Sequence, residues 1–139
     1  MQAKRSDKKI WILRLEKGEE IISAMSKFCR ENKINGGFFY GIGACDMVRI
    51  AHYDEISKKY SSRKFKKALE LLNITGNIAR EKELIIHAHV TLADNQFHVF
   101  GGHLLEGRIS ITSEIFLCAL PTLKKKFDPE TGLKLLDLQ

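Results

Sequence analysis

The chain has 139 residues, an apolar content of 44% and a formal net charge of +6. This length suits one domain, and this apolar content is sufficient to bury a core. No apolar run is long enough to cross a bilayer, and the first residues lack the apolar core and small-residue cleavage site of a signal peptide. We therefore expect a soluble protein with one cytoplasmic domain over residues 1–139.

The three cysteines, Cys29, Cys45 and Cys118, are widely spaced and form no C-x-x-C pair. A disulfide framework and a thiolate zinc cage are therefore not indicated. We interpret these cysteines as small buried apolar residues in a reducing compartment.

Positive charge is concentrated in "KRSDKK", in "KKYSSRKFKK" and in "KKK" at Lys124 to Lys126. Such clusters can attract nucleic acid or another polyanion. They are equally typical of solvated loops and strand edges, where lysine discourages edge-to-edge pairing. We prefer the second interpretation, because no cluster is combined with exposed aromatic residues or a groove-reading motif.

In chain order, "IWILRL" (Ile10 to Leu15) predicts a first strand, and Glu19 to Lys33 has apolar residues at helical spacing after an acidic first turn. The helix should end at "NKINGG". The remaining segments predict strands: "GGFFYGIGACDMVRIAHYD", "KKALELLNITGNIAR", "ELIIHAHVTL", "FHVFGGHLL", "RISITSEIFLCAL" and two extended pieces around "DPETG", the last being "LKLLDL". Within "KKALELLNITGNIAR", one strand should start at about Ala68 and another should begin after "NITG". This pattern predicts an α+β fold with a largely antiparallel sheet and few flanking helices.

The glycine-rich "GGFFYGIGA" is not a phosphate loop, because it lacks the Gly-Lys-Ser/Thr ending of a P-loop and is followed by strand-like alternation. We expect Gly41 and Gly43 to mark a bulge or the close approach of another backbone.

His87 and His89 lie two residues apart in a predicted strand, so their side chains should point to the same face, about 7 Å apart along the chain. The opposite face, from Leu84 to Leu92, is apolar throughout. Two imidazoles in this arrangement can bind one metal ion.

A third ligand depends on the register of the hairpin. If Ala93 pairs with Phe97 around a three-residue loop, His103 falls opposite His87 on the same face, and Gly101 opposite His89 leaves room for an ion. A two-residue turn would move His103 to the other face, unless a bulge at Gly101 and Gly102 restores it.

The metal hypothesis therefore names His87, His89 and His103 as ligands of zinc or another divalent transition metal, with water or a small anion completing the shell. The alternative is a set of surface or hydrogen-bonded histidines on a half-exposed strand. Two histidines are poorer candidates. His98 lies on the opposite face from His103 in the regular register, and His52 is remote in sequence.

Glu114 is a carboxylate within the apolar stretch "ISITSEIFLCAL". It could orient a ligand histidine as a hydrogen-bond acceptor, but we prefer a solvent-facing or subunit-interface position.

These residues resemble a known family. "GIGA", "ALELLNITGNIAR", "HAHVTLADNQFHVFGGHLLEG" and "SEIFL" are similar to the plants and prokaryotes conserved (PPC) domain, over about residues 10–120. The resemblance implies an antiparallel sheet with flanking helices, assembly as a homotrimer, and a metal, usually zinc, at the histidines that match His87, His89 and His103. Plant members carry an AT-hook for DNA, whose Arg-Gly-Arg-Pro core this chain lacks.

Three functional hypotheses follow. The first is a homotrimeric binding or regulatory module with a histidine metal site. The second is a DNA-associated regulator whose basic clusters bind nucleic acid weakly. The third, which we favour least, is a metal-dependent enzyme acting on a small anionic substrate, with Glu114 as a base.

Overall fold

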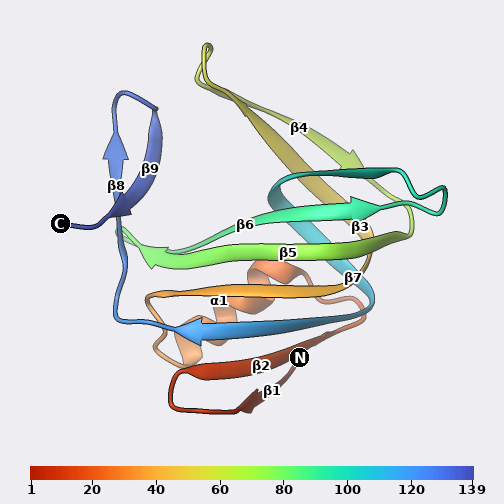
Figure 1. The fold of residues 1–139 in the computed structure, drawn as a ribbon, viewed down its shortest axis with the longest axis horizontal. Coiled ribbons are helices and arrows are strands. Elements are labelled where there is room, and N and C mark those ends of the chain that lie inside the picture. Colours follow the sequence, from red (N-terminus) through yellow and green to blue (C-terminus); the bar gives the residue numbers. More distant parts are fainter.

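The computed structural model describes residues 1–139 and contains one helix and nine strands (Figure 1). The helix, α1, spans Ile21–Glu31. The strands are β1 (Gln2–Arg5), β2 (Ile10–Glu16), β3 (Gly37–Asp54), β4 (Lys59–Phe65), β5 (Leu69–Arg80), β6 (Leu84–Ala93), β7 (Val99–Ala119), β8 (Lys124–Asp128) and β9 (Leu133–Asp137).

All nine strands belong to one sheet, and every pairing is antiparallel except a single parallel contact between β5 and β8. Four strands close a circuit, because β3 and β6 each pair with both β5 and β7. The predicted antiparallel sheet is therefore confirmed. The α+β class fits only loosely, since a single helix accompanies the sheet.

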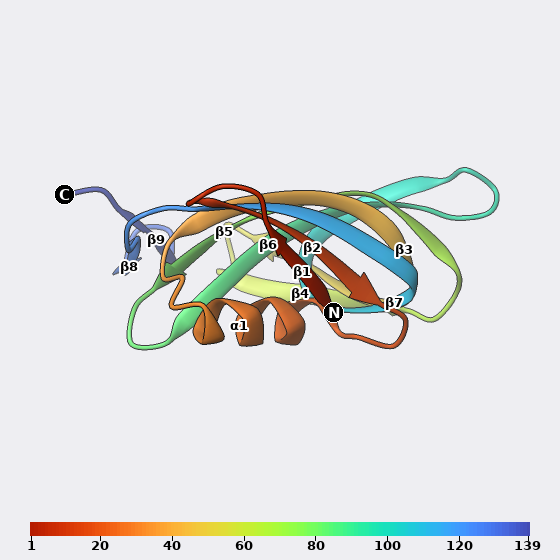
Figure 2. The same ribbon diagram turned by 90° about the horizontal axis from the view of Figure 1, so that it is seen from below.

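Helix α1 packs against one face of the sheet and leaves the other face free of helices (Figure 2). Its buried residues join a core that draws on β2, β3, β5, β6 and β7. Glu20 caps the helix, because its carboxylate accepts hydrogen bonds from the backbone N–H groups of Ile22 and Ser23. The same carboxylate accepts a bond of 3.1 Å from the backbone N–H of Gly107, which ties the start of α1 to the middle of β7.

Two predicted breaks do not occur. The segment around "NITG" lies within a single strand, β5, and a local bulge near Leu71 and Asn73 takes up the irregularity. Likewise "FHVFGGHLL" and "RISITSEIFLCAL" form one strand of 21 residues, β7. Both strands continue because neighbours on either side supply backbone hydrogen bonds, which outweigh the local turn propensity.

The first basic cluster begins at the end of β1 and continues into the turn after it, and most of the second cluster lies in β4. "KYSSRKF" forms β4, an edge strand that pairs only with β3, and "QAKR" forms β1, which pairs only with β2. The positive residues of these two clusters thus lie on edge strands and in the turns beside them, as expected.

The glycines of "YGIGA" have the expected role. The pairing of β3 with β5 shifts register between Gly41 and Gly43. A Cβ atom on Gly43 would lie 2.4 Å from the carbonyl oxygen of Thr112, so β7 approaches too closely for any side chain there.

Apolar side chains project from the helix-free face of the sheet. Phe38, Tyr40 and Ile42 of β3 and Phe116 of β7 are between 41% and 60% exposed, and the rings of Tyr40 and Phe116 stack with centroids 5.5 Å apart. We call these four residues the apolar patch. The structure contains no helix with the length and apolar character that crossing a bilayer requires.

Candidate metal centre

His87 and His89 project from β6 onto the helix-free face. Their cross-strand partners on β5 are Asn77 and Thr75, and Thr75 in turn pairs with Tyr40 of the apolar patch. The intervening side chain of Ala88 is 1% exposed and belongs to the core. Strand alternation therefore anchors β6 by its apolar face and presents the two imidazoles on the other side.

His103 lies on β7 directly opposite His89, not opposite His87 as predicted. The reason is a longer turn: the last pair before it is Ala93 with Val99. The carboxylate of Asp94 stabilises this turn by accepting hydrogen bonds of 3.0 Å from the backbone N–H groups of Gln96 and His98. The slip relative to the predicted pairing is an even number of residues, so His103 keeps the same face.

The predicted role of Gly101 is wrong. Gly101 pairs with Thr91 rather than His89. A Cβ atom there would lie 2.2 Å from the carbonyl oxygen of Val90, so this glycine permits close packing of β6 and β7 instead of making room for an ion.

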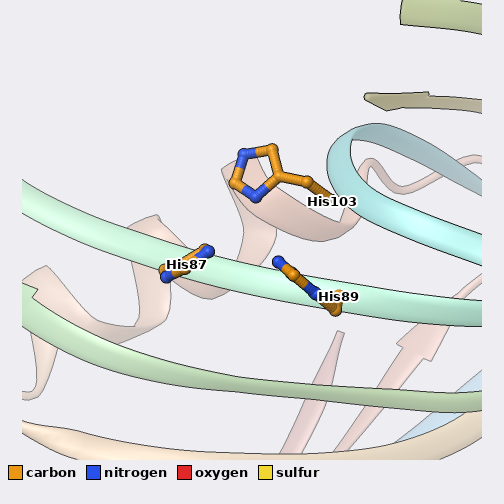
Figure 3. Close-up of side chains that lie close together, drawn as sticks. All are labelled: His87, His89 and His103. Atoms are coloured by element: carbon orange, nitrogen blue, oxygen red, sulfur yellow. The ribbon is translucent and has the colours of Figure 1, made fainter. Parts of the chain in front are cut away.

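The three imidazoles point toward one another across β6 and β7 (Figure 3). Their ring centroids are 5.0 to 5.5 Å apart, and one nitrogen from each ring lies within 4.8 Å of the others. Nitrogens bound at about 2.1 Å to a tetrahedral ion are about 3.4 Å apart, which lies within the 4.8 Å limit on the separation of these atoms.

One nitrogen of this cluster has no partner. The Nδ1 atom of His103 is buried and forms no hydrogen bond, and the buried Oδ1 atom of Asn77 is likewise unpaired. A buried polar atom without a partner costs free energy. A metal ion suits these residues, because it would order the imidazoles and because neutral nitrogen donors are its usual ligands.

Burial sets the electrostatics of the cluster. It lowers the pKa of His87 from 6.5 to about 4, with smaller contributions from Lys125 and the other two histidines. Burial also lowers the pKa of His103. Both rings are therefore held neutral, which is the form that binds a metal.

Lys125 was not predicted as part of this site. Its side chain reaches the cluster from β8, and its Nζ atom lies 3.3 Å from Nδ1 of His87. Burial lowers the pKa of this ammonium group. Sequence reasoning grouped it with two solvated neighbours, although alternation along a strand places Lys124 and Lys126 on the opposite side, where they are exposed.

The remaining candidates lie elsewhere. His98 sits in the hairpin turn beside Asp94 with 71% of its side chain exposed, and His52 is an exposed residue of β3. Glu114 is exposed on β7, where it pairs with Ile42 and Arg14. None of the three belongs to the histidine cluster.

The chain matches the family model of the Plants and Prokaryotes Conserved (PCC) domain over residues 2–121. It is similar to a solved structure from Bacteroides thetaiotaomicron, described as a proposed DNA-binding protein, with 25% identity, a TM-score of 0.93 and coverage of 98% of this chain and 96% of that one. It is also similar to a metal-containing protein from Archaeoglobus fulgidus, with 28% identity, a TM-score of 0.87 and coverage of 98% of each chain.

Among curated proteins the chain is 28% identical to the bifunctional protein GlmU of a Synechococcus strain, over 94% of this chain. The chain spans about a fifth (20%) of the length of that relative.

The low pKa of His87 makes the stability of the metal-free protein depend on pH. The folded state keeps this ring neutral down to pH about 4, whereas the unfolded chain takes up a proton near pH 6.5. The contribution of His87 to the free energy of unfolding is therefore complete above pH 6.5 and is lost as the pH falls toward 4.

Urea unfolding in the presence of a chelator, measured from pH 7.5 to 4, should show a shallower loss of stability in His87→Asn than in the wild type. His52→Asn, which removes an exposed imidazole of β3, is the control. Equal slopes in all three proteins would contradict the assigned burial of His87.

Proposed function

The chain belongs to the Plants and Prokaryotes Conserved (PCC) domain family, and from this premise we propose that it is a metal-binding module. In this proposal His87, His89 and His103 hold one divalent transition metal, with zinc as the first choice. The observation that carries it is the convergence of three imidazole nitrogens within 4.8 Å of one another, from two neighbouring strands.

The chemistry of the cluster supports this assignment. Three nitrogen donors without a carboxylate or thiolate suit zinc, although they also bind nickel, copper or iron. The protein supplies three ligands, so water or a small anion completes a tetrahedral shell. The description of the Archaeoglobus fulgidus relative as metal-containing agrees with a metal at this position.

The direct test is metal content. The wild type, loaded with zinc and then freed of excess metal, should retain about one zinc per chain, whereas His87→Ala, His89→Ala and His103→Ala should each lose most of it. Zinc should also raise the melting temperature of the wild type, because it binds the folded state in preference to the unfolded chain.

His98→Ala is the matched control, since His98 is a histidine of the same hairpin that lies outside the cluster. It should retain zinc as the wild type does. If the three cluster variants also retain zinc, or if the wild type does not bind it, the proposal fails.

We also propose that the protein assembles as a homotrimer through its helix-free face. The apolar patch consists of large side chains that no element of the same chain covers. A group of large, exposed apolar side chains on one face is typical of an interaction site. The resemblance to the PPC domain implies a trimer, and its closed symmetry would cover the patch in every copy.

Phe38→Glu should dissociate the assembly into monomers at micromolar concentration, because it places a charge where an apolar ring would be buried. Phe127→Glu is the matched control, since Phe127 is a comparably exposed phenylalanine of β8, outside the patch. Sedimentation velocity measures both. A wild type that sediments as a monomer would remove the trimer proposal.

A second candidate function is weak binding of nucleic acid. The edge strand β4 presents exposed cationic side chains, among them Lys59 and Arg63, which form no ion pair. The description of the Bacteroides thetaiotaomicron relative points the same way. The one helix, α1, packs against the sheet and is not free to enter the major groove of DNA. We therefore propose contacts that are electrostatic and independent of base sequence.

Fluorescence anisotropy with two duplexes of unrelated sequence should give equal affinities that fall steeply between 50 and 200 mM salt, by about tenfold or more. The double variant Lys59→Gln/Arg63→Gln should bind more weakly and with a smaller salt dependence. Strong preference for one duplex that persists at high salt would contradict sequence-indifferent binding.

A further inference from the structure

A pocket of about 260 Å³ opens beside the histidine cluster, between the sheet and the β8–β9 hairpin. His87 and His103 form one part of its wall, and Lys125 forms another. Ile85, Leu133 and Leu135 contribute apolar surface, together with the ring of Tyr60, whose centroid lies 5.5 Å from that of His103. The pocket thus has the candidate metal position and the Lys125 ammonium group side by side in its wall, next to apolar surface.

Lys125 is unusual within this pocket because it is buried without an acidic partner. The residue is 8% exposed, and its one side-chain hydrogen bond is the contact with His87. The other pocket lysine, Lys134, is neutralised by an ion pair with Glu81. A buried ammonium group without a counter-charge is costly, and an anion bound beside Lys125 would supply the counter-charge that the chain lacks.

Metal binding would remove even the contact with His87. If Nδ1 of His87 binds the metal, its lone pair is no longer free for Lys125. If Nε2 binds the metal, Nδ1 carries the ring proton and becomes a donor that faces another donor. In either case Lys125 needs a new acceptor as soon as the metal is bound.

The charge balance leads to the same requirement. Three neutral imidazoles leave the charge of a divalent ion intact, and Lys125 adds another positive charge. No aspartate or glutamate belongs to the cluster. An anion placed between the metal and Lys125 would satisfy both and fill the open metal position.

We propose that this pocket binds a small organic carboxylate, with one oxygen on the metal and hydrogen bonding from Lys125. The inference rests on the proposed metal function. A carboxylate suits a site with one free ammonium group, and a short apolar tail suits the walls formed by Leu133 and Leu135. Phosphate would lack the several donors that it usually receives in proteins.

The β8–β9 hairpin thereby becomes part of the site. Residues 124–137 follow the region that matches the family model, which ends at residue 121. Lys125 and the two leucines all come from this hairpin. The ligand preference of the chain would therefore be set by a segment outside the matched domain.

The test uses the full chain loaded with cobalt(II), whose visible absorption reports both metal binding and the arrival of an anion. Titration with butyrate should change the spectrum of the wild type and saturate. Butyramide, which has the same shape and no charge, should leave the spectrum unchanged.

Lys125→Met should keep the cobalt absorption and bind butyrate at least about tenfold more weakly, since a hydrogen bond from a charged group is lost. Lys126→Met is the matched control, because Lys126 is the exposed neighbour on the same strand. It should titrate like the wild type, and circular dichroism should show that both variants are folded.

The outcomes separate the two proposals. If the wild type shows no absorption from bound cobalt, the metal proposal and the carboxylate proposal both fail. Cobalt binding with equal butyrate affinity in the wild type and Lys125→Met would overturn only the carboxylate site. Tighter binding of inorganic phosphate than of butyrate would also overturn the carboxylate assignment.

Discussion

The candidate site and the core both depend on strand β7, which hydrogen-bonds to different neighbours along its 21 residues. Its first part pairs with β6, its last part pairs with β2, and β3 follows it through most of its length. A strand has only two hydrogen-bonding edges. Strand β3 occupies one edge of β7, and the other edge pairs first with β6 and then with β2. Strands β3, β5, β6 and β7 thereby close a circuit. The same arrangement places His103 beside His89.

The buried apolar face of β6 determines where the imidazoles of His87 and His89 lie. Ala88, Val90 and Leu92 fix one face of β6 in the core, so the imidazoles of His87 and His89 are held on the other face at little conformational cost. Burial then keeps the ring of His87 neutral. Packing thus prepares the ligands for a cation before any cation binds, which reduces the reorganisation that binding requires.

The helix-free face carries both the histidine cluster and the apolar patch. It presents the histidine cluster, and two strands away it presents the apolar patch, linked through the pairing of Tyr40 with Thr75 and of Thr75 with His89. An assembly that covers the patch would therefore also limit the access of solvent to the histidines.

The sequence by itself determined the local features: the apolar strand β2, the alternation of β6, the helix after Glu20, the bulge at Gly41 and Gly43, and the common face of His87 and His89. These follow from side-chain periodicity and backbone sterics, which act between near neighbours. Turn propensity alone predicted breaks in β5 and β7 that pairing with adjacent strands removed.

Only the tertiary structure decided the partner of His103 and the place of Lys125. The register of β6 and β7 depends on how Asp94 closes the turn, so His103 faces His89 and Gly101 faces Thr91. Lys125 is 38 positions from His87 and reaches it only because the β8–β9 hairpin docks against the end of the sheet. A pattern of neighbouring residues carries no information about such a contact, because its formation depends on the closure of a long loop and on the packing of the whole sheet.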